Sequence, residues 1–520
     1  MKPTLMATAA AVIALGATNA MAQSITPQHV DETARAAIEA FDIPGMAITV
    51  VTGDDIVFMH GYGVRDVRDP DTPVDTDTLL PFASISKAFT TTLIAMLVDE
   101  DKLDWDTPVR EFIPEFEMSD PYITAEFSVR DLVTHRSGLP LGAGDLLVFP
   151  DAEPDVSDIL AALRNIPPET SFRSEYAYDN LLYVIAGEVV SRIEGKPWAE
   201  VMEERIFTPL SMDSCEALPG AAAEAGNTVT QHSRAPGQSE AEPIDPRYIL
   251  GDNTSPAGGI SCSISDLSTW AQFWLNEGVA PSGERLISED QAEELWTGVT
   301  PQNVSPLLEQ LSRTHFSLYG LGWTLRDFNG QLLVGHSGGL LGASSYFGIL
   351  PEEDLAVFVT SNVATYGSTA LALQLLGDAS APEADSDWIG TLHGVYQRMQ
   401  ETAVNDSGSG ERQDVPVEPV RDLVAYTGSY VDPWYGPVSI ENRDGRLFID
   451  MSRSEVLDAF LVPVAPDRFV ARWPDRSLNA DAYVDFVADE GRVTGMTMVP
   501  VSETTDFSFD FEDLQFTKQP

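Results

Sequence analysis

The stretches that read as β-strands fall at both ends of one long region, with a helical block between them. They lie at residues 45–52, 55–61, 319–326, 331–335, 344–350 and 355–361. A Gly53-Asp54-Asp55 turn joins the first two strands as a hairpin, and Asn329-Gly330 joins the next pair. Hairpins make neighbouring strands antiparallel, and these strands do not alternate with helices. We therefore predict an α+β fold, an antiparallel sheet flanked by helices, and not a doubly wound sheet.

An all-helical subdomain is expected between the two groups of strands. Residues from 84 to about 212 are mostly helical in pattern and rich in loops. A further helix is expected before the first strand, over residues 27–41, where Thr26 and Pro27 provide an N-cap and a first turn. The other candidate helices are residues 86–99, 128–134, 180–193, 265–277 and 369–377.

The last part of the chain differs in composition from the rest. We predict a helix at residues 388–402, then an acidic Gly/Ser-rich linker at 405–413, then short strands separated by turns that form a small antiparallel β-barrel. A chain of 520 residues is too long for one ordinary core. The expected parts are residues 23–378, a helix and linker over 379–419, and a β domain over 420–520. This β domain could cap a cleft, or only stabilise the chain or its oligomer.

The first 22 residues are typical of a secretory signal peptide. Lys2 gives a positive start, an apolar run follows, and Ala20-Met21-Ala22 matches the small-x-small cleavage pattern. No later stretch reaches 18 unbroken apolar residues, so no stable membrane span is expected. We therefore expect a periplasmic or secreted protein.

The charge of the chain excludes one class of partner. Acidic residues number 81 against 30 basic residues, which gives a formal net charge of −51. Such a surface repels nucleic acid and anionic lipid, so a nucleic-acid enzyme is not expected.

The two cysteines, Cys215 and Cys262, could pair in an oxidising compartment. The sequence does not show whether their Cα atoms lie close enough. Without a histidine cluster nearby they do not make a zinc site, and no acidic run has calcium-loop spacing. No metal site is therefore predicted.

The segment Phe82-Ala83-Ser84-Ile85-Ser86-Lys87 contains a candidate nucleophile and base. In a helix that begins at Ser84, Lys87 lies one turn on and on the same face. A serine hydroxyl needs a base to remove its proton, and a lysine amine can be that base when desolvation or a nearby cation keeps it neutral. The alternative is a capped helix with a surface lysine.

Two other segments offer groups that could work with this pair. Tyr178 and Asn180 precede an apolar helix, and a phenol beside an ammonium can relay protons while an amide holds both a lysine and a substrate carbonyl. The alternative is a buried tyrosine with an N-capping asparagine. In Gly335-His336-Ser337-Gly338-Gly339, glycines after a strand let substrate lie along its edge, and a backbone N–H just past Gly338 could bind an oxyanion.

The same glycine-rich segment also fits Gly-x-Ser-x-Gly, the nucleophile elbow of α/β-hydrolases. That motif needs a helix after the serine, whereas Ser337 is followed by two glycines and another strand-like run. Only His393 remains downstream as a histidine partner, in a helix outside the large domain. Ser337 is therefore disfavoured as a nucleophile.

Three motifs in order resemble the active site of the penicillin-recognising serine hydrolases, in their class C β-lactamase branch. They are Ser84-x-x-Lys87, Tyr178-x-Asn180 and His336-Ser337-Gly338, with further similarity at 131–139 and 256–260. The resemblance covers roughly residues 26–378. The last part of the chain resembles the lipocalin-like β domains appended to some esterases and D-amino-acid peptidases of this branch.

This resemblance implies that Ser84 is acylated by a carbonyl substrate while Lys87 and Tyr178 shuttle the proton, with either one as the base. It implies that Asn180 positions substrate and that the N–H groups of Ser84 and Gly339 bind the oxyanion. It implies no metal or organic cofactor.

One departure from the family pattern bears on substrate. True β-lactamases of this branch carry a lysine where this chain has His336, which is mostly neutral at pH 7 and binds a carboxylate less well. We expect hydrolysis of a small ester or a peptide-like amide, as in an esterase or D-amino-acid peptidase. A DD-peptidase or weak β-lactamase is the alternative, and a non-catalytic peptide- or ligand-binding protein is the alternative of another class.

Overall fold

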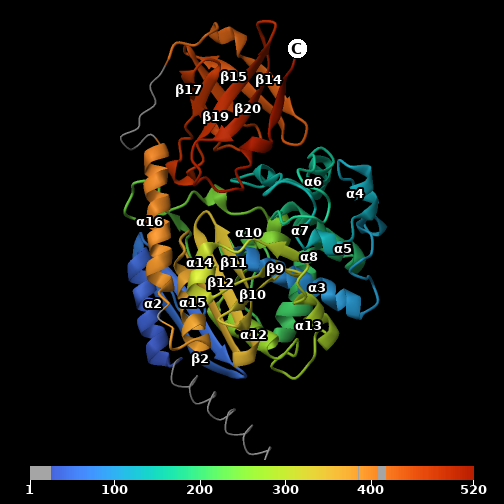
Figure 1. Cartoon of the computed structure of the whole chain (residues 1–520), viewed down its shortest axis with the longest axis vertical. Helices are drawn as coiled ribbons and strands as arrows, with labels where there is room; N and C mark the ends of the chain where they lie inside the picture. The colour runs from blue at the N-terminus through green and yellow to red at the C-terminus, as the bar shows by residue number, and fades with distance from the viewer. Residues whose placement is uncertain (1–24, 385, 408–416) are drawn as a thin grey trace, which may run out of the picture.

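The two groups of strands come together in one antiparallel sheet. In this computed structural model, which describes residues 25–384, 386–407 and 417–520, the strand order is β3-β2-β1-β13-β12-β11-β10-β9-β8 (Figure 1). β1 pairs with β13, with Met46 opposite Ser361. This pairing joins the strands that precede the helical block in the sequence to those that follow it. The strands are β1 Gly45–Thr52, β2 Asp55–Asp66, β3 Asp69–Pro73, β8 Thr300–Gln302, β9 Ser317–Tyr319, β10 Thr324–Phe328, β11 Gln331–Leu340, β12 Ala343–Leu350 and β13 Leu355–Ser361.

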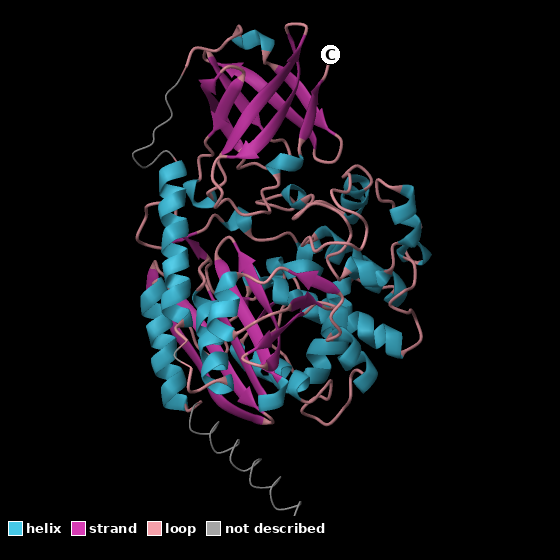
Figure 2. Cartoon of the chain, in the orientation of Figure 1, coloured by secondary structure: helices cyan, strands magenta, loops and turns pink. Residues whose placement is uncertain are grey.

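Three helices cover one face of the sheet: α2 (Pro27–Phe41), α15 (Gly367–Ser380) and α16 (Trp388–Asp406) (Figure 2). α2 begins where the sequence predicts, because the Thr26 side chain accepts a hydrogen bond from His29 N and Pro27 needs no amide partner. Alternate residues of β1 divide between two cores: Ile48 packs toward these helices and Ala47 packs toward the opposite face.

The helical block lies against that opposite face. Its central helix α3 is buried on nearly every side, from Ser86 to Leu97, because the sheet and the other helices surround it. The helices of this block are α3 Ser86–Asp99, α4 Pro121–Glu126, α5 Val129–Leu132, α6 Val156–Leu163, α7 Leu181–Glu194, α8 Trp198–Met202, α9 Thr208–Leu210, α10 Pro219–Glu224, α11 Ser255–Gly258, α12 Ile264–Leu275 and α13 Glu289–Leu295. The short helix α14 (Pro306–Ser312) instead packs through Leu311 into the core on the side of α2 and α15. Short strand pairs, β4 Leu80–Pro81 with β7 Ser261–Cys262 and β5 His232–Ser233 with β6 Glu242–Pro243, join its loops.

The last hundred residues form a closed antiparallel barrel. Closure comes from the pairing of the first strand with the last, with Tyr430 opposite Lys518. Aromatic rings fill part of its core, such as Tyr426, Phe469 and Phe486 in mutual contact. Its strands are β14 Gly428–Asp432, β15 Gly436–Arg443, β16 Arg446–Asp450, β17 Asp458–Ala465, β18 Arg468–Ala471, β19 Ala482–Asp489, β20 Arg492–Pro500 and β21 Gln515–Lys518.

The barrel packs directly on the helical block, above α6 and α7 in Figure 1. Its buried apolar side chains belong to the same continuous core as those of the block. The connection between β20 and β21, residues 501–514, reaches down to the loop before α6, where the Phe509 and Phe149 rings lie 6.4 Å apart. We call residues 501–514 the barrel loop.

The predicted α+β fold with an antiparallel sheet, an all-helical subdomain and a C-terminal barrel is confirmed. Three predicted strands were wrong in extent. The run at 55–61 continues to Asp66, because its last residues pair with β3. The run at 319–326 is two strands, β9 and β10, because the chain turns at Gly322, whose φ is +87°. The run at 331–335 continues to Leu340, because residues 336–340 go on pairing with β12.

Other predictions fall partly or wholly outside the described residues. The expected signal peptide lies there. The expected linker begins inside α16, which extends to Asp406, and its remainder from residue 408 lies outside the described part.

Cys215 and Cys262, whose pairing the sequence left open, form a disulfide. None of the helices that the structure describes is both long and apolar enough to cross a bilayer.

Candidate active site

Ser84 lies in a tight turn just before α3, and not at the first residue of the helix itself. The turn is a 3₁₀ helix, η1 (Ala83–Ile85), and the preceding residue Ala83 has a φ of +51°, in the left-handed region that alanine seldom adopts. The Ser86 hydroxyl donates to Ala83 O at 2.7 Å and accepts from Ile260 N, which holds the turn. Ser84 itself is partly exposed and lines a cleft.

The Lys87 side chain is fully buried beneath Ser84. Its Nζ lies 3.2 Å from Ser84 Oγ, and it donates to Asn180 Oδ1 at 2.8 Å and to the Ala257 carbonyl at 2.7 Å. Burial lowers the pKa of Lys87 to about 7, although the nearby carboxyl groups of Asp145 and Asp179 work in the opposite direction. A sizeable fraction of this amine is therefore neutral at neutral pH.

Asn180 stands at the N-terminal end of α7, but its side chain makes no capping bond. The neighbouring Asp179 does this instead, since its Oδ1 accepts from Leu182 N at 3.0 Å. Asn180 is therefore free to face the cleft, and its Nδ2 donates to Asp145 Oδ2 at 2.9 Å. Because Nδ2 is engaged by a carboxyl oxygen, Oδ1 points to Lys87, and the predicted alternative of an N-capping asparagine is wrong.

Tyr178 lies on the other side of the lysine, with its ring centroid 4.7 Å from Lys87 Nζ. Burial raises the pKa of Tyr178 well above its ordinary value, and the interaction with Ser84 opposes this shift only in part. The His135 ring packs 4.2 Å from the Tyr178 ring, centroid to centroid, and His135 Nδ1 accepts from Asp179 N. Tyr178 is thus held as a neutral phenol at neutral pH.

The predicted glycine-rich segment lies within β11 and beside Ser84. β10 pairs with β11 only as far as Gly335, so residues 336–340 have a free edge on that side. A side chain at Gly338 would collide with Phe82 O at 2.3 Å, so a glycine is needed for the strand to approach the Ser84 turn. A side chain at Gly339 would meet no atom within 4 Å, and this residue opens to the cleft, as does the exposed Ser337.

His336 is buried at the edge of the same cleft. Its Nδ1 lies 2.6 Å from the Ser337 carbonyl, which can only accept, so Nδ1 carries the proton and Nε2 accepts from the Tyr319 hydroxyl at 3.1 Å. Burial and the Lys87 charge lower the pKa of His336 to about 4. The side chain is therefore neutral at physiological pH and offers no permanent positive charge to a substrate.

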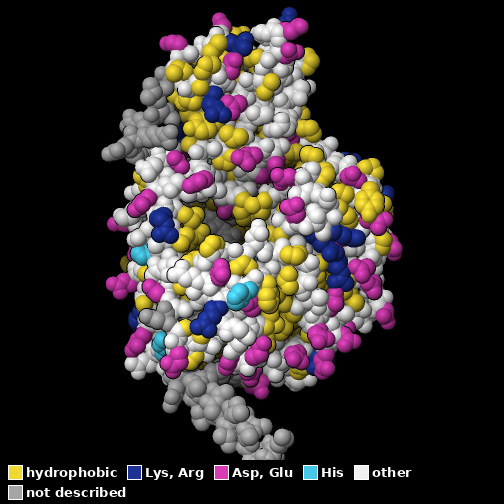
Figure 3. All heavy atoms as spheres, viewed as in Figure 1, with side chains coloured by type: hydrophobic (Ala, Val, Ile, Leu, Met, Phe, Trp, Pro, Cys, Tyr) yellow, Lys and Arg dark blue, Asp and Glu magenta, His cyan; other side chains and the backbone are white. Residues whose placement is uncertain are grey.

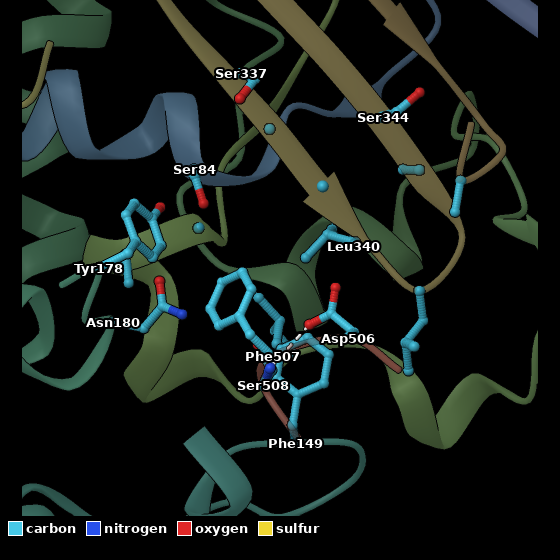
Figure 4. Close-up of a pocket in the computed structure, with 18 of the residues that line it drawn as sticks. Ser84, Phe149, Tyr178, Asn180, Ser337, Leu340, Ser344, Asp506, Phe507 and Ser508 are labelled. Atoms are coloured by element: carbon cyan, nitrogen blue, oxygen red, sulfur yellow. Dashed lines mark hydrogen bonds between the residues drawn. The ribbon is translucent and has the colours of Figure 1, made fainter. Parts of the chain in front are cut away.

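A cavity of about 680 Å³ between the sheet, the helical block and the barrel is lined by Ser84, Tyr178, Asn180 and residues 336–339, with Lys87 beneath its floor at Ser84. Figure 3 shows this face hollowed below the barrel, with hydrophobic side chains at the rim. In Figure 4, Ser84, Tyr178 and Asn180 lie along one wall, and Asp506 and Phe507 face them from the barrel loop. In residues 25–384, 386–407 and 417–520, no group of three or more His, Cys, Asp or Glu could hold a metal ion.

The structure thus brings together all eight residues singled out from the sequence: Ser84, Lys87, Tyr178, Asn180, His336, Ser337, Gly338 and Gly339. Sequence reasoning missed Asp145 and the barrel loop residues Asp506, Phe507 and Ser508. Asp145 sits in no recognisable motif, and the barrel residues are more than 300 positions away from it. Ala257 lies within the segment 256–260 that resembles the family, although no role was predicted for its carbonyl.

Two family models match the chain. The model described as "Beta-lactamase" matches residues 30–379, and a "Domain of unknown function (DUF3471)" matches residues 412–518. The first match spans about two thirds of the chain and contains all eight residues singled out from the sequence, as well as Asp145.

Known proteins resemble both parts. "Unguisins hydrolase ungD'" of Aspergillus campestris (strain IBT 28561) is 28% identical over 472 residues, which cover 86% of this chain and 84% of that protein. The D-aminopeptidase of Brucella anthropi is 27% identical over 371 residues, covering 67% of this chain and 63% of that protein. The octameric penicillin-binding protein homologue from Pyrococcus abyssi has a TM-score of 0.58 at 20% identity, covering 93% of this chain and 98% of that one, which shows a shared fold.

Proposed function

The chain belongs to the beta-lactamase family and is a serine hydrolase of that family, and we propose that it cleaves an ester or a peptide-like amide through an acyl-enzyme on Ser84. The observation that carries this proposal is the set of three contacts made by Lys87 Nζ. A neutral amine has two N–H donors and one lone pair. The Ala257 carbonyl and Asn180 Oδ1 can only accept, so they take the two N–H groups and the lone pair is left for the Ser84 hydroxyl.

In this proposal Lys87 is the general base. It takes the proton of Ser84 as Oγ bonds to the substrate carbonyl carbon. The buried environment that lowers the pKa of Lys87 to about 7 keeps enough of the amine neutral for this step. The same environment raises the pKa of Tyr178, so Tyr178 acts as a phenol and not as a phenolate base.

Tyr178 then completes the proton transfer. When the tetrahedral intermediate collapses, the bond to the leaving nitrogen or oxygen breaks, and the leaving group takes a proton from the Tyr178 hydroxyl while Lys87 returns its proton to Tyr178. In the second half of the cycle, water attacks the acyl carbon and loses a proton to the same pair. The bond between the acyl carbon and Ser84 Oγ then breaks, and the pair returns that proton to Oγ, so Ser84 and Lys87 regain their starting protonation states. Protons and charges therefore balance over one turnover.

We assign the oxyanion to the backbone N–H groups of Ser84 and Gly339. The absence of a side chain at Gly338 supports this assignment, because it lets β11 approach the Ser84 turn. Asn180 would help to position the substrate carbonyl. The free edge of β11 from His336 to Leu340 suits an extended, peptide-like chain.

The neutral His336 bears on substrate choice. A β-lactam carries a carboxylate that a permanent cation binds well, and His336 with its lowered pKa supplies none. We therefore place small esters and peptides with D-residues ahead of β-lactams as substrates. The D-aminopeptidase and the unguisins hydrolase among the relatives support a peptide-like amide. A DD-peptidase or weak β-lactamase remains the alternative within the enzyme class.

We also propose that the protein is exported and works in the periplasm or outside the cell. The signal-like first 22 residues support export, as does the Cys215–Cys262 disulfide, since disulfides persist in oxidising compartments. Its partner would be a small ester or peptide, and not nucleic acid.

A fluorophosphonate probe tests the proposal, because it labels activated serines covalently. We expect one adduct, located on Ser84 by peptide mass spectrometry, that is lost in Ser84→Ala. A panel of p-nitrophenyl esters, D- and L-aminoacyl anilides and nitrocefin then ranks the substrates. Absence of labelling in the folded wild-type protein would favour the non-catalytic binding protein instead.

A further inference from the structure

The barrel loop is connected to the active site by hydrogen bonds to a buried carboxyl group, that of Asp145. Asp145 Oδ2 accepts two hydrogen bonds, from Asn180 Nδ2 on one side and from Ser508 Oγ of the barrel loop on the other, each at 2.9 Å. Asn180 Oδ1 in turn accepts from Lys87. A continuous chain of polar contacts therefore runs from the barrel to the amine beside Ser84.

Asp145 is placed to control the orientation of one amide. An asparagine side chain can rotate its oxygen and nitrogen into each other's positions, and only one of the two orientations lets Oδ1 accept from Lys87. Asp145 Oδ2 selects that orientation because it accepts from Nδ2. The Asp145 side chain is fully buried and its Oδ1 has no partner, so this contact and that to Ser508 are what hold it.

The backbone around Asp145 is also fixed by the barrel loop. Asp510 accepts from Gly144 N at 2.6 Å and from Leu146 N at 3.1 Å, on either side of Asp145. Gly144 has a φ of +80°, and a Cβ there would lie 2.5 Å from Leu181 Cδ1, so a glycine is needed for the loop to take this path before Asp145. Asp510 and Ser508 together hold both the main chain and the side chain of Asp145.

We propose that Asp145 is a positioning residue of the active site and that the barrel completes this site by holding Asp145 through Ser508 and Asp510. The inference rests on the proposed Ser84 chemistry. It gives the barrel a role beyond the two considered from the sequence, capping the cleft and stabilising the chain. Without the barrel loop, the Asn180 amide would lose its fixed orientation and Lys87 would lose one of its two acceptors.

A pair of matched serine variants of the full-length protein tests the barrel contact. Ser508 and Ser454 are both buried in the barrel, and each donates to an aspartate of the hydrolase part, Ser508 to Asp145 and Ser454 to Asp151. Only the first contact leads to Asn180. We expect Ser508→Ala to lower the rate constant of Ser84 labelling by a fluorophosphonate at least about tenfold, and Ser454→Ala to leave it within about twofold.

Asp145 provides the second arm, with a conservative rescue. In Asp145→Asn the amide oxygen can still accept from Asn180 and Ser508, so labelling should stay within a few-fold of wild type, whereas Asp145→Ala should lose at least about tenfold. Equal loss in Asn and Ala variants of equal thermal stability would contradict the positioning role.

The outcomes separate this inference from the proposed function. If wild type is not labelled at Ser84, the proposed function fails. If wild type is labelled and Ser508→Ala is labelled at the same rate, or if Ser454→Ala slows labelling as much as Ser508→Ala does, the proposed function stands and the inference is overturned.

Discussion

The Lys87 side-chain nitrogen lies 2.7 Å from the carbonyl oxygen of Ala257, more than 150 residues further along the chain. This carbonyl accepts one N–H of the neutral lysine amine, and Asn180 Oδ1 accepts the other. The lone pair of the nitrogen is therefore directed at the Ser84 hydroxyl. The role of Lys87 as the base follows from this arrangement, because a buried amine with two fixed acceptors has only one direction in which to accept a proton.

Replacement of Tyr178 by phenylalanine should separate two classes of substrate. The phenol is proposed to protonate the leaving group, and p-nitrophenolate leaves without protonation whereas an amide nitrogen does not. We expect Tyr178→Phe to reduce kcat/KM for aminoacyl anilides by about 10²-fold or more and for p-nitrophenyl esters by clearly less. Steady-state kinetics on the two series provide the measurement. An equal loss on both would assign Tyr178 to the attack on the carbonyl instead.

Replacement of His336 by lysine should increase activity against β-lactams. The neutral imidazole offers no charge to a substrate carboxylate, while an ammonium group at the same position in the cleft would. We expect the ratio of nitrocefin to p-nitrophenyl acetate hydrolysis to rise about tenfold or more in His336→Lys. The neutral variant His336→Gln is the control and should leave the ratio unchanged. A similar ratio in all three proteins would show that this position does not govern carboxylate recognition.

Removal of the disulfide should affect stability more than catalysis. Cys262 belongs to β7, which pairs with β4 two residues before the Ser84 turn begins, and Cys215 tethers it across 47 residues. A loop of this length corresponds to about 4 kcal/mol of unfolding free energy in the chain-entropy model. We expect Cys215→Ala/Cys262→Ala to unfold several degrees lower in calorimetry and to keep most of its kcat. An unchanged melting temperature would rule out a stabilising role.

The buried carboxyl at Asp145 predicts how stability depends on pH. Burial and the neighbouring Asp179 raise the pKa of Asp145 to about 8 from an ordinary value of 3.8. Between these two values the folded protein holds a proton that the unfolded chain releases, so this group makes stability fall as pH rises from about 4 to 8.

Asp145→Asn removes that contribution and should therefore narrow the difference in melting temperature between pH 5 and pH 8. Asp506→Asn, which changes an exposed carboxyl of the barrel loop, is the control and should leave the difference as in wild type. A difference unchanged in both variants would contradict the raised pKa of Asp145.

The sequence predicted those parts of the site whose residues are close together in the chain or follow a strong local pattern. Ser84 and Lys87 are one turn apart, so helix geometry predicts that their side chains lie on the same face. Tyr178 and Asn180 stand together just before an apolar helix, which marks the segment as one unit. The two strand groups also met as expected, since antiparallel hairpins at both ends of a helical block leave few other arrangements.

The parts that the sequence did not predict depend on contacts across long separations. Asp145 lies in a loop without periodicity, and its partner Ser508 is 363 positions away, so no local pattern marks either of them. Likewise, the extension of β11 to Leu340 through two glycines depends on pairing with β12 and on close approach to Phe82, neither of which strand propensity reports.

The pH dependence of Ser84 labelling tests the central claim most directly, since that claim is that a neutral Lys87 accepts the serine proton. With the pKa of Lys87 at about 7, the labelling rate constant of wild type should rise about tenfold per pH unit below pH 7 and level off above it. Lys87→Met should label at least about 10²-fold more slowly and without this dependence. A rate independent of pH between 5 and 9 in wild type, or a Lys87→Met variant that labels as fast as wild type, would contradict the account.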